Sequence, residues 1–183
     1  MVNSFEKLIK LIPPPANPLE VGNMEEWGKI EEELKLKLPE DYKRIVCTYG
    51  TGYWMEFLWV LNPFSKGEYF NLQEQIRSQL DAEREIKKEY PEEIPFPIYP
   101  EEGGLLPWAM TDNGDRLYWL TSGLPEQWAT IIYESRGPEY DKRKSSCSEI
   151  LLRWVTGKIK IKVFPEDFNY DTENVFVPFD VNQ

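Results

Sequence analysis

Apolar residues recur at helical spacing in five segments of the 183-residue chain. Within each segment they lie three or four positions apart, so they share one helix face and leave the other faces polar. The longest segment carries charged runs such as ERE and KKE, which are typical of a solvated helix surface. The segments predicted as helices are 4–12, 23–34, 39–49, 71–90 and 146–155.

Polar residues at the starts of three of these segments have the spacing of helix caps. Asn23 and Glu26 can form a capping box, in which each side chain satisfies the backbone N–H of the other residue. Ser146 and Glu149 repeat that spacing before the last helix. Ser4 is placed to cap the first one. We therefore expect these helices to begin at the residues named.

Proline and glycine mark where other elements begin or end. Pro39 is predicted as a first-turn residue of the third helix, and Gly50 as its left-handed stop. Prolines also predict extended or irregular connectors at 13–20 and 91–104. Between a glycine and a proline, the aromatic-rich run 53–61 is predicted as one strand.

The stretch LLPWAMTDNGDRLYWL, residues 105–120, predicts a β-hairpin. Asn113 and Gly114 are the favoured pair for a two-residue type I′ turn, because both central positions take positive φ. The period of two along each strand then decides which residues face each other. The pairs expected on one face are Asp112–Asp115, Met110–Leu117 and Trp108–Trp119.

The remaining pattern completes the prediction of fold class. A strand is expected at 127–134, followed by a basic loop around 142–144. After Gly157 the residues alternate in KIKIKVF, and the acidic segment 165–183 contains no Lys or Arg. Helices flanking a mainly antiparallel sheet predict one α+β domain spanning 1–183, and the 41% hydrophobic content suits a single core.

The amino-acid composition indicates which class of partner the protein is expected to bind. The net charge of −11 argues against direct binding of nucleic acid, which needs clustered Lys and Arg to neutralise phosphates. It favours a basic protein partner, because charge complementarity speeds encounter. Aromatic residues make up 14% of the chain, which predicts that some of them, such as Trp54, lie in an exposed binding surface.

The sequence contains no histidine, which excludes Ser-His-Asp and Cys-His nucleophile systems, histidine metal sites and the usual general base. Cys147 lies on the apolar stripe of the last helix and is predicted to be a small buried hydrophobe. Cys47 lies beside the stripe of its own helix. Neither thiol has an imidazole to lower its pKa, and two cysteines are too few for a Cys-only zinc site. The cysteines therefore supply no catalytic group, and we expect no metal or cofactor.

Carboxylates remain the only catalytic option. A glycosidase-like pair needs two acids roughly 5–9 Å apart in a cleft, and among 32 acidic residues such a pair arises easily by chance. DNGD lacks the alternating oxygen ligands and the later Glu of an EF-hand loop. The main interpretation is therefore that Asp112 and Asp115 only help to form the turn, and a two-carboxylate ion site remains an alternative.

Four segments in a fixed order resemble the SUKH superfamily, which includes the fungal Smi/Knr cell-wall regulators and many bacterial immunity proteins. The resemblance covers residues 24–157, and the N-terminal helix and the acidic C-terminal segment lie outside it. The matching positions are the aromatic of the first family helix, Leu38-Pro39, Tyr42, Gly50, the hairpin Gly114-Asp115 and the closing helix. The segments are WGKIEEELKLKLPEDYKRIVCTYGTGYW, FLWVLNPF, GGLLPWAMTDNGDRLYWL and SSCSEILLRWVTGKI.

The resemblance implies a non-enzymatic α+β protein without a shared catalytic set. Bacterial members are implied to bind and neutralise a cognate polymorphic toxin, often a basic nuclease or deaminase. A cytosolic immunity protein is therefore the first hypothesis. A regulatory scaffold of the Smi/Knr type is the alternative, and a carboxylate-based hydrolase or sugar-binding protein is a third.

Candidate contacts with a protein partner are acidic residues around the hairpin and one aromatic residue. The N-terminal segment has no apolar run long enough for a signal peptide, and no segment approaches the ~20 apolar residues of a membrane span. We therefore expect a cytoplasmic location and no membrane partner. The candidate contact residues are Asp112, Asp115, Glu101, Glu102 and Trp54.

Overall fold

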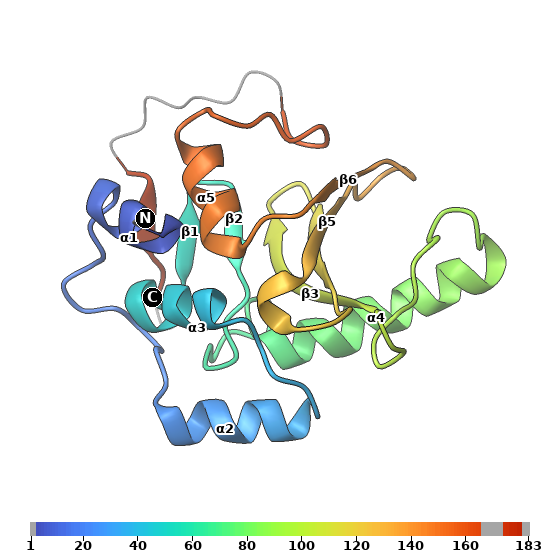
Figure 1. Ribbon diagram of the computed structural model, residues 1–183, viewed down its shortest axis with the longest axis horizontal. Helices are drawn as coiled ribbons and strands as arrows, with labels where there is room; N and C mark the ends of the chain where they lie inside the picture. Colours follow the sequence, from blue (N-terminus) through green and yellow to red (C-terminus); the bar gives the residue numbers. More distant parts are fainter. Residues whose placement is uncertain (1–2, 166–173, 181–183) are drawn as a thin grey trace.

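Helices cover both faces of one antiparallel sheet in the computed structural model, which describes residues 3–165 and 174–180 (Figure 1). The seven strands of the described chain lie in the order β6-β5-β4-β3-β2-β1-β7, which confirms the predicted α+β class. The strands are Gly52–Trp54 (β1), Leu58–Val60 (β2), Leu105–Thr111 (β3), Arg116–Leu120 (β4), Ala129–Tyr133 (β5), Tyr140–Arg143 (β6) and Phe176–Pro178 (β7). The helices are Ser4–Leu11 (α1), Met24–Glu33 (α2), Glu40–Tyr49 (α3), Leu72–Glu89 (α4) and Cys147–Val155 (α5), with a short 3-10 helix at Pro125–Gln127.

Neighbouring residues of β4 show which helices cover which face of the sheet. The Trp119 ring packs edge-on against Tyr42 of α3, with ring centroids 4.9 Å apart. The preceding residue, Tyr118, donates its hydroxyl to Glu83 of α4 at 2.7 Å. Because successive side chains of a strand point to opposite faces, α3 and α4 lie on opposite sides of the sheet. In Figure 1, α4 is the green helix on the side away from α1 and α5.

All seven tryptophans are buried, so the prediction that some would form an exposed surface is wrong for this residue type. Trp54, the named candidate, is only 1% exposed and packs against Tyr49, with ring centroids 4.7 Å apart. Trp108 and Trp119 stack in the sheet interior with centroids 6.0 Å apart. A sheet covered by helices on both faces has two apolar layers, and these layers take up the large rings.

Local capping chemistry places the helix starts close to their predicted positions. Asn23 and Glu26 form the full capping box. The cap of α1 is Asn3 rather than Ser4, and its side chain accepts the Glu6 N–H at 2.8 Å. Ser146 caps α5 by accepting a backbone N–H. Asn3 and Ser4 are both suitable caps, and periodicity alone does not choose between neighbours.

The predicted strand 53–61 is instead two short strands joined by a tight turn. Met55 and Glu56 both have a φ of 55°, and the Phe57 N–H donates to the Trp54 carbonyl at 3.0 Å. This backbone is that of the type I′ hairpin turn, which normally uses Asn or Gly. Met55 and Glu56 are not residue types that favour turns, so the sequence gives no indication of a turn here. The prediction of one continuous strand was wrong for this reason.

The predicted basic loop at 142–144 lies largely within β6, which pairs with β5 in antiparallel register. The KIKIKVF segment runs beside it without forming a strand. The Arg143 guanidinium donates to the Lys160 carbonyl at 3.0 Å, and the Lys162 N–H donates to the Asp141 carboxylate at 3.3 Å. Side-chain hydrogen bonds from β6 therefore hold this segment beside the sheet, instead of the backbone hydrogen bonds that a paired strand would make.

The acidic C-terminal segment contributes an unexpected edge strand. Its described part, 174–180, contains β7, which pairs with β1 in antiparallel register. Residues 166–173 and 181–183 of the segment lie outside the described residues. Some 120 positions separate the two paired strands, so no local pattern indicates their pairing.

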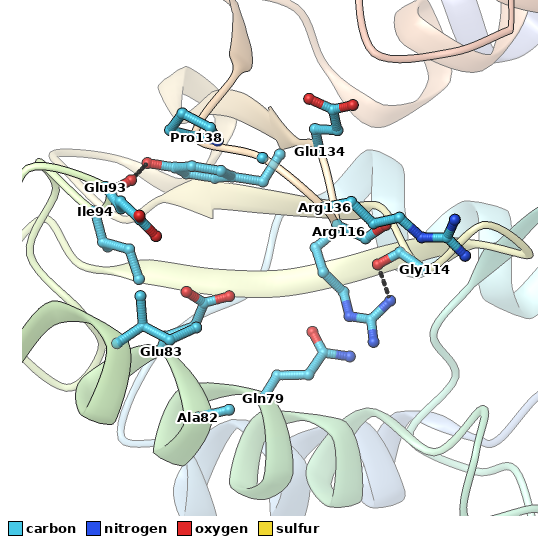
Figure 2. Close-up of a pocket in the computed structure, with 14 residues that line it drawn as sticks. Gln79, Ala82, Glu83, Glu93, Ile94, Gly114, Arg116, Glu134, Arg136 and Pro138 are labelled. Carbon is cyan, nitrogen blue, oxygen red and sulfur yellow. Dashed lines mark hydrogen bonds between the residues drawn. The ribbon is translucent and has the colours of Figure 1, made fainter. Parts of the chain in front are cut away.

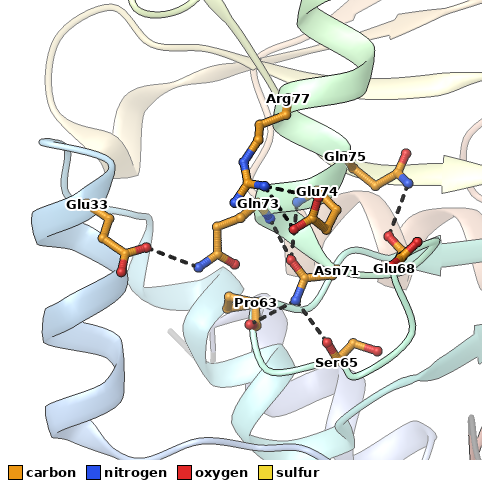
Figure 3. Close-up of polar contacts among 9 residues, drawn as sticks. All are labelled: Glu33, Pro63, Ser65, Glu68, Asn71, Gln73, Glu74, Gln75 and Arg77. Atoms are coloured by element: carbon orange, nitrogen blue, oxygen red, sulfur yellow. Dashed lines mark hydrogen bonds and ion pairs between the residues drawn. The ribbon is translucent and has the colours of Figure 1, made fainter.

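Asn71 joins the start of α4 to the preceding loop (Figure 3). Its Oδ1 accepts the N–H groups of Gln73 and Glu74 at 3.0 and 3.2 Å, and its Nδ2 donates to the Ser65 carbonyl at 2.9 Å. Gln73 also reaches Glu33 of α2 at 3.5 Å. One side chain therefore determines both where α4 begins and how the loop approaches it.

Replacing Asn71 with alanine is expected to lower the free energy of unfolding by about 1.5 kcal/mol, because the helix loses its cap and the loop loses its anchor. Urea unfolding followed by circular dichroism measures the change. Ser78→Ala, at an exposed position of the same helix, serves as the control and should be nearly neutral. An equal loss in both variants would contradict the capping role.

Candidate functional site

The DNGD hairpin ends in a three-residue loop rather than the predicted two-residue turn. The Thr111 N–H donates to the Asp115 carbonyl at 3.0 Å, and the Gly114 N–H donates to the Thr111 carbonyl at 2.9 Å. Gly114 has a φ of 92°, whereas Asn113 is not among the residues with positive φ. These features are those of a type I turn followed by a glycine, so the type I′ prediction is wrong.

The three-residue loop also changes the predicted strand register. Arg116 faces Met110, and Trp119 faces Leu106, with a register shift on β3 between Pro107 and Ala109. The expected Asp112–Asp115, Met110–Leu117 and Trp108–Trp119 pairs are therefore not opposite each other.

Asp115 is buried, with 3% of its surface exposed, and it connects two turns. Its Oδ2 accepts the Thr111 hydroxyl at 3.0 Å within the hairpin, and its Oδ1 accepts the Ser135 N–H at 3.1 Å from the turn between β5 and β6. Ser135 in turn donates its hydroxyl to the Asn113 carbonyl at 2.9 Å. The carboxylate that sequence analysis placed on a contact surface lies inside the fold.

Asp112 lies on the exposed side of the same loop and has a different partner. Its Oδ1 accepts the Trp59 indole N–H at 2.7 Å, and its own backbone N–H donates to the Phe57 carbonyl at 3.0 Å. The exposed carboxylate of Asp112 therefore bonds to a side chain of β2, whereas the carboxylate of Asp115 is enclosed beside Ser135. The two acids do not form a facing pair.

The two glutamates of the preceding connector lie far from this loop. Glu101 and Glu102 are exposed in the turn before β3, whereas the DNGD loop follows the other end of that strand. Seven residues of extended chain separate the two ends, which corresponds to roughly 20 Å. Trp54 is buried under α3. The structure does not gather the five candidates into one site, and partner contact by Asp112, Glu101 and Glu102 stays a prediction.

A cleft of about 510 Å³ lies between α4, the hairpin loop and the turn between β5 and β6 (Figure 2). Its polar lining comes from both sides. Gln79 and Glu83 rise from α4, Arg116 descends from β4, and Arg136 lies on the turn. Sequence analysis missed this group, because residues from three separate elements form it. A signal that could have indicated this group is the pair Gln79 and Glu83, two polar residues four positions apart at the buried edge of the amphipathic helix α4.

Glu83 is the acid with the most perturbed environment in this cleft. Burial raises the pKa of its carboxyl, and the hydrogen bond from Tyr118 and the charge of Arg116 offset only part of that rise. Burial, together with Glu83, also raises the pKa of Tyr118, so this hydroxyl remains a proton donor at neutral pH. Arg116 is held by a short hydrogen bond from its Nη1 to the Gly114 carbonyl.

Gln79 supplies an acceptor that has no partner among the described residues. Its Nε2 donates to Gln75 Oε1 at 2.5 Å, and the Gln75 Nε2 donates to the Glu68 carbonyl at 3.4 Å. This chain of donors assigns the orientation of both amides and leaves Gln79 Oε1 buried and unbonded. A buried acceptor without a donor is costly, so this atom indicates where a ligand donor would be favourable.

Both cysteines occupy structural positions. Cys147 is buried, as predicted, and its sulfur accepts the Trp119 indole N–H at 3.3 Å. Burial raises the pKa of its thiol, so it stays protonated at neutral pH. Cys47 is exposed and accepts the Trp27 indole N–H at 3.1 Å. Neither sulfur lines the cleft.

Two features are absent from the described part of the chain. No three Cys, Asp or Glu side chains lie close enough together there to hold a metal ion. Of the helices within residues 3–165 and 174–180, none has the length and apolar character needed to cross a membrane.

One family model matches the chain, over residues 24–151, and its description is SUKH_6, SMI1-KNR4 cell-wall. The matched range begins at α2 and ends within α5, so it includes the DNGD hairpin and the cleft. No curated protein and no solved structure shows significant similarity to the chain.

Proposed function

The chain belongs to the SUKH_6 (SMI1-KNR4) family, and from this membership we propose that it is a non-catalytic immunity protein that binds and occludes a cognate toxin. The family match, which covers more than half of the chain, is the observation that carries the proposal. The toxin domain is expected to be basic and of the nuclease or deaminase type. Both proteins would meet in the cytoplasm.

The charge of the chain supports a basic partner. The net charge is −11, and the exposed part of α2 carries four carboxylates against one lysine. Such a surface raises the rate of encounter with a positively charged domain and lowers the rate with nucleic acid. The exposed acids Asp112, Glu101 and Glu102 remain proposed contacts.

The arrangement of the two DNGD acids favours binding over hydrolysis at this loop. An acid pair for glycoside hydrolysis must face one substrate from two sides of a cleft. Asp112 instead bonds to Trp59, and Asp115 is enclosed beside Ser135. A protein that acts by covering its partner needs surface complementarity and no such pair.

Co-expression with the neighbouring gene product tests the proposal. The wild-type chain should restore growth of cells that express this toxin, and the two proteins should co-purify as a complex. A toxin variant inactivated at its own catalytic residue separates binding from toxicity. Absence of both protection and complex formation would contradict the immunity function.

The family description, SMI1-KNR4 cell-wall, favours a second candidate, a regulatory scaffold of the Smi/Knr type. This function predicts several partners in the producing cell and no toxin encoded nearby. Deletion of the gene would then change cell-wall or stress phenotypes in the absence of any toxin, whereas loss of an immunity protein has an effect only when the toxin is present.

A further inference from the structure

We propose that the cleft between α4 and the hairpin loop receives an arginine side chain of the protein partner, with its guanidinium bonded to Gln79 Oε1 and the Glu83 carboxylate. This inference rests on the proposed function for the identity of the partner. The geometry of the cleft itself is independent of that function and can be tested without the toxin.

The unfilled acceptor is the first observation that points to a ligand donor. Gln79 is 7% exposed, and its Oε1 has no hydrogen-bond partner among the described residues. Because its Nε2 is already bonded to Gln75, the amide cannot turn to supply a donor without breaking that bond. Figure 2 shows the Gln79 side chain rising from α4 into the space below β4.

The second observation is a carboxylate that lacks an ion pair. Glu83 accepts the Tyr118 hydroxyl, but within the described chain no Lys or Arg nitrogen lies within ion-pair distance of it. The carboxylate points from α4 toward the sheet (Figure 2). The charge of Arg116 compensates burial only in part, so a further cation bonded to this carboxylate would stabilise its ionised form, which is consistent with the raised pKa of Glu83.

The spacing of the two acceptors selects a guanidinium over an ammonium. Gln79 and Glu83 are four residues apart on α4, so their Cβ atoms are about 5–6 Å apart on one helix face. A guanidinium carries five donors in a planar fork and can bond to both acceptors. An ammonium is more compact and more strongly hydrated, and it loses more on entering a half-buried site.

The cleft also contains positive groups, which could favour an anionic ligand instead. Arg116 and Arg136 line it, together with the carboxylates of Glu83, Glu93 and Glu134. Arg116 is tied to the Gly114 carbonyl of its own hairpin, which directs one edge of its guanidinium away from Glu83 (Figure 2). A carboxylate ligand could approach the arginines, but it would leave Gln79 Oε1 unpaired and face Glu83 with a like charge.

Titration of the isotope-labelled chain with short peptides tests the inference by NMR. The probes are Ac-Gly-Arg-Gly-NH2, Ac-Gly-Lys-Gly-NH2 and Ac-Gly-Glu-Gly-NH2. The arginine peptide should shift the amide signals of Gln79, Glu83 and Ser135, and the lysine peptide should bind more weakly. Glu83→Gln should weaken arginine binding about fivefold, and Gln79→Met about threefold. Glu85→Gln makes the same charge change at an exposed residue of α4 outside the cleft and should leave binding unchanged.

Three outcomes would overturn the inference: no shifts with the arginine peptide, equal binding to wild type and Glu83→Gln, or preferential binding of the glutamate peptide. Thermal unfolding of each variant shows whether it is folded. If Glu83→Gln does not fold, the loss of arginine binding in Gln79→Met tests the inference instead. If the wild-type chain protects cells but does not bind the arginine peptide, the arginine site in the cleft is rejected and the immunity function is not. Peptide binding without protection would reject the immunity function alone.

Discussion

Asp115→Ala is expected to lower the free energy of unfolding by about 3 kcal/mol, although Asp112→Ala in the same loop should cost only about 1 kcal/mol. Asp115 is buried and accepts hydrogen bonds from the Thr111 hydroxyl and the Ser135 N–H. Removing it leaves the buried Thr111 hydroxyl without its acceptor and removes the side-chain bond from the β3–β4 loop to the β5–β6 turn, where only the bond from the Ser135 hydroxyl to the Asn113 carbonyl then joins the two. Asp112 is exposed, so water can replace its bond to Trp59.

Urea unfolding of both alanine variants measures the difference, and Asp112→Ala serves as the matched control because it removes the same chemical group. Asp115→Asn adds an intermediate case: one amide oxygen can still accept the Ser135 N–H, so part of the stability should return. Equal losses for the two alanine variants would show that Asp115 does not join the turns.

Glu31→Gln is expected to lower the free energy of unfolding at pH 7 by roughly 3 kcal/mol, because it removes the buried counter-charge of the mostly buried Lys43 ammonium. Glu31 is 7% exposed and accepts the Leu38 N–H at 3.1 Å. The ammonium groups of Lys37 and Lys43 lie 2.6 and 3.0 Å from its carboxylate. Lys43 is itself mostly buried, so neutral glutamine leaves it with only Glu40 as a counter-charge.

The stabilisation by Glu31 depends on pH. Burial alone would raise the pKa of Glu31, but the hydrogen bonds from Lys37, Leu38 and Lys43 outweigh burial and hold the pKa below its ordinary value. A carboxyl whose pKa is lower in the folded state contributes its full stabilisation above the unfolded pKa, which is about 4.3. This contribution is lost as the pH falls through the folded pKa.

Unfolding at pH 7 and at pH 3 tests this dependence. The stability difference between wild type and Glu31→Gln should shrink at the lower pH, because the stabilisation by the ionised carboxylate declines once the pH falls below the unfolded pKa. Glu32→Gln, at the exposed neighbouring position of α2, should be close to wild type at both values. A constant difference across the range would contradict the ionic contribution.

Three elements were predictable in place and type because their signals act over a few residues. The Asn23 capping box, the apolar stripe of α5 with buried Cys147, and the hairpin around DNGD all depend on contacts within one turn of helix or one loop. A side chain that bonds three residues away is visible in the sequence. These local patterns, with the absence of histidine, limited the chain to an α+β fold without histidine chemistry.

The errors concern interactions between residues distant in sequence. Asn-Gly favours a two-residue turn locally, but Asp115 bonds to Ser135, twenty residues away, and this bond accompanies the longer loop. Met55 and Glu56 adopt positive φ without turn chemistry, where β1 pairs with the distant strand β7. Tertiary contacts can stabilise a backbone that local propensity disfavours.

The sequence by itself determined the starts of α2 and α5, the position of the hairpin and the charge that favours a basic partner. Only the tertiary structure decided that Asp115 is interior, that Trp54 is covered, and that Gln79 and Glu83 face a cleft with Arg116. The physical reason is the range of the interactions. Capping and periodicity act along the chain, whereas burial and the meeting of α4 with β4 depend on which distant segments fold against each other.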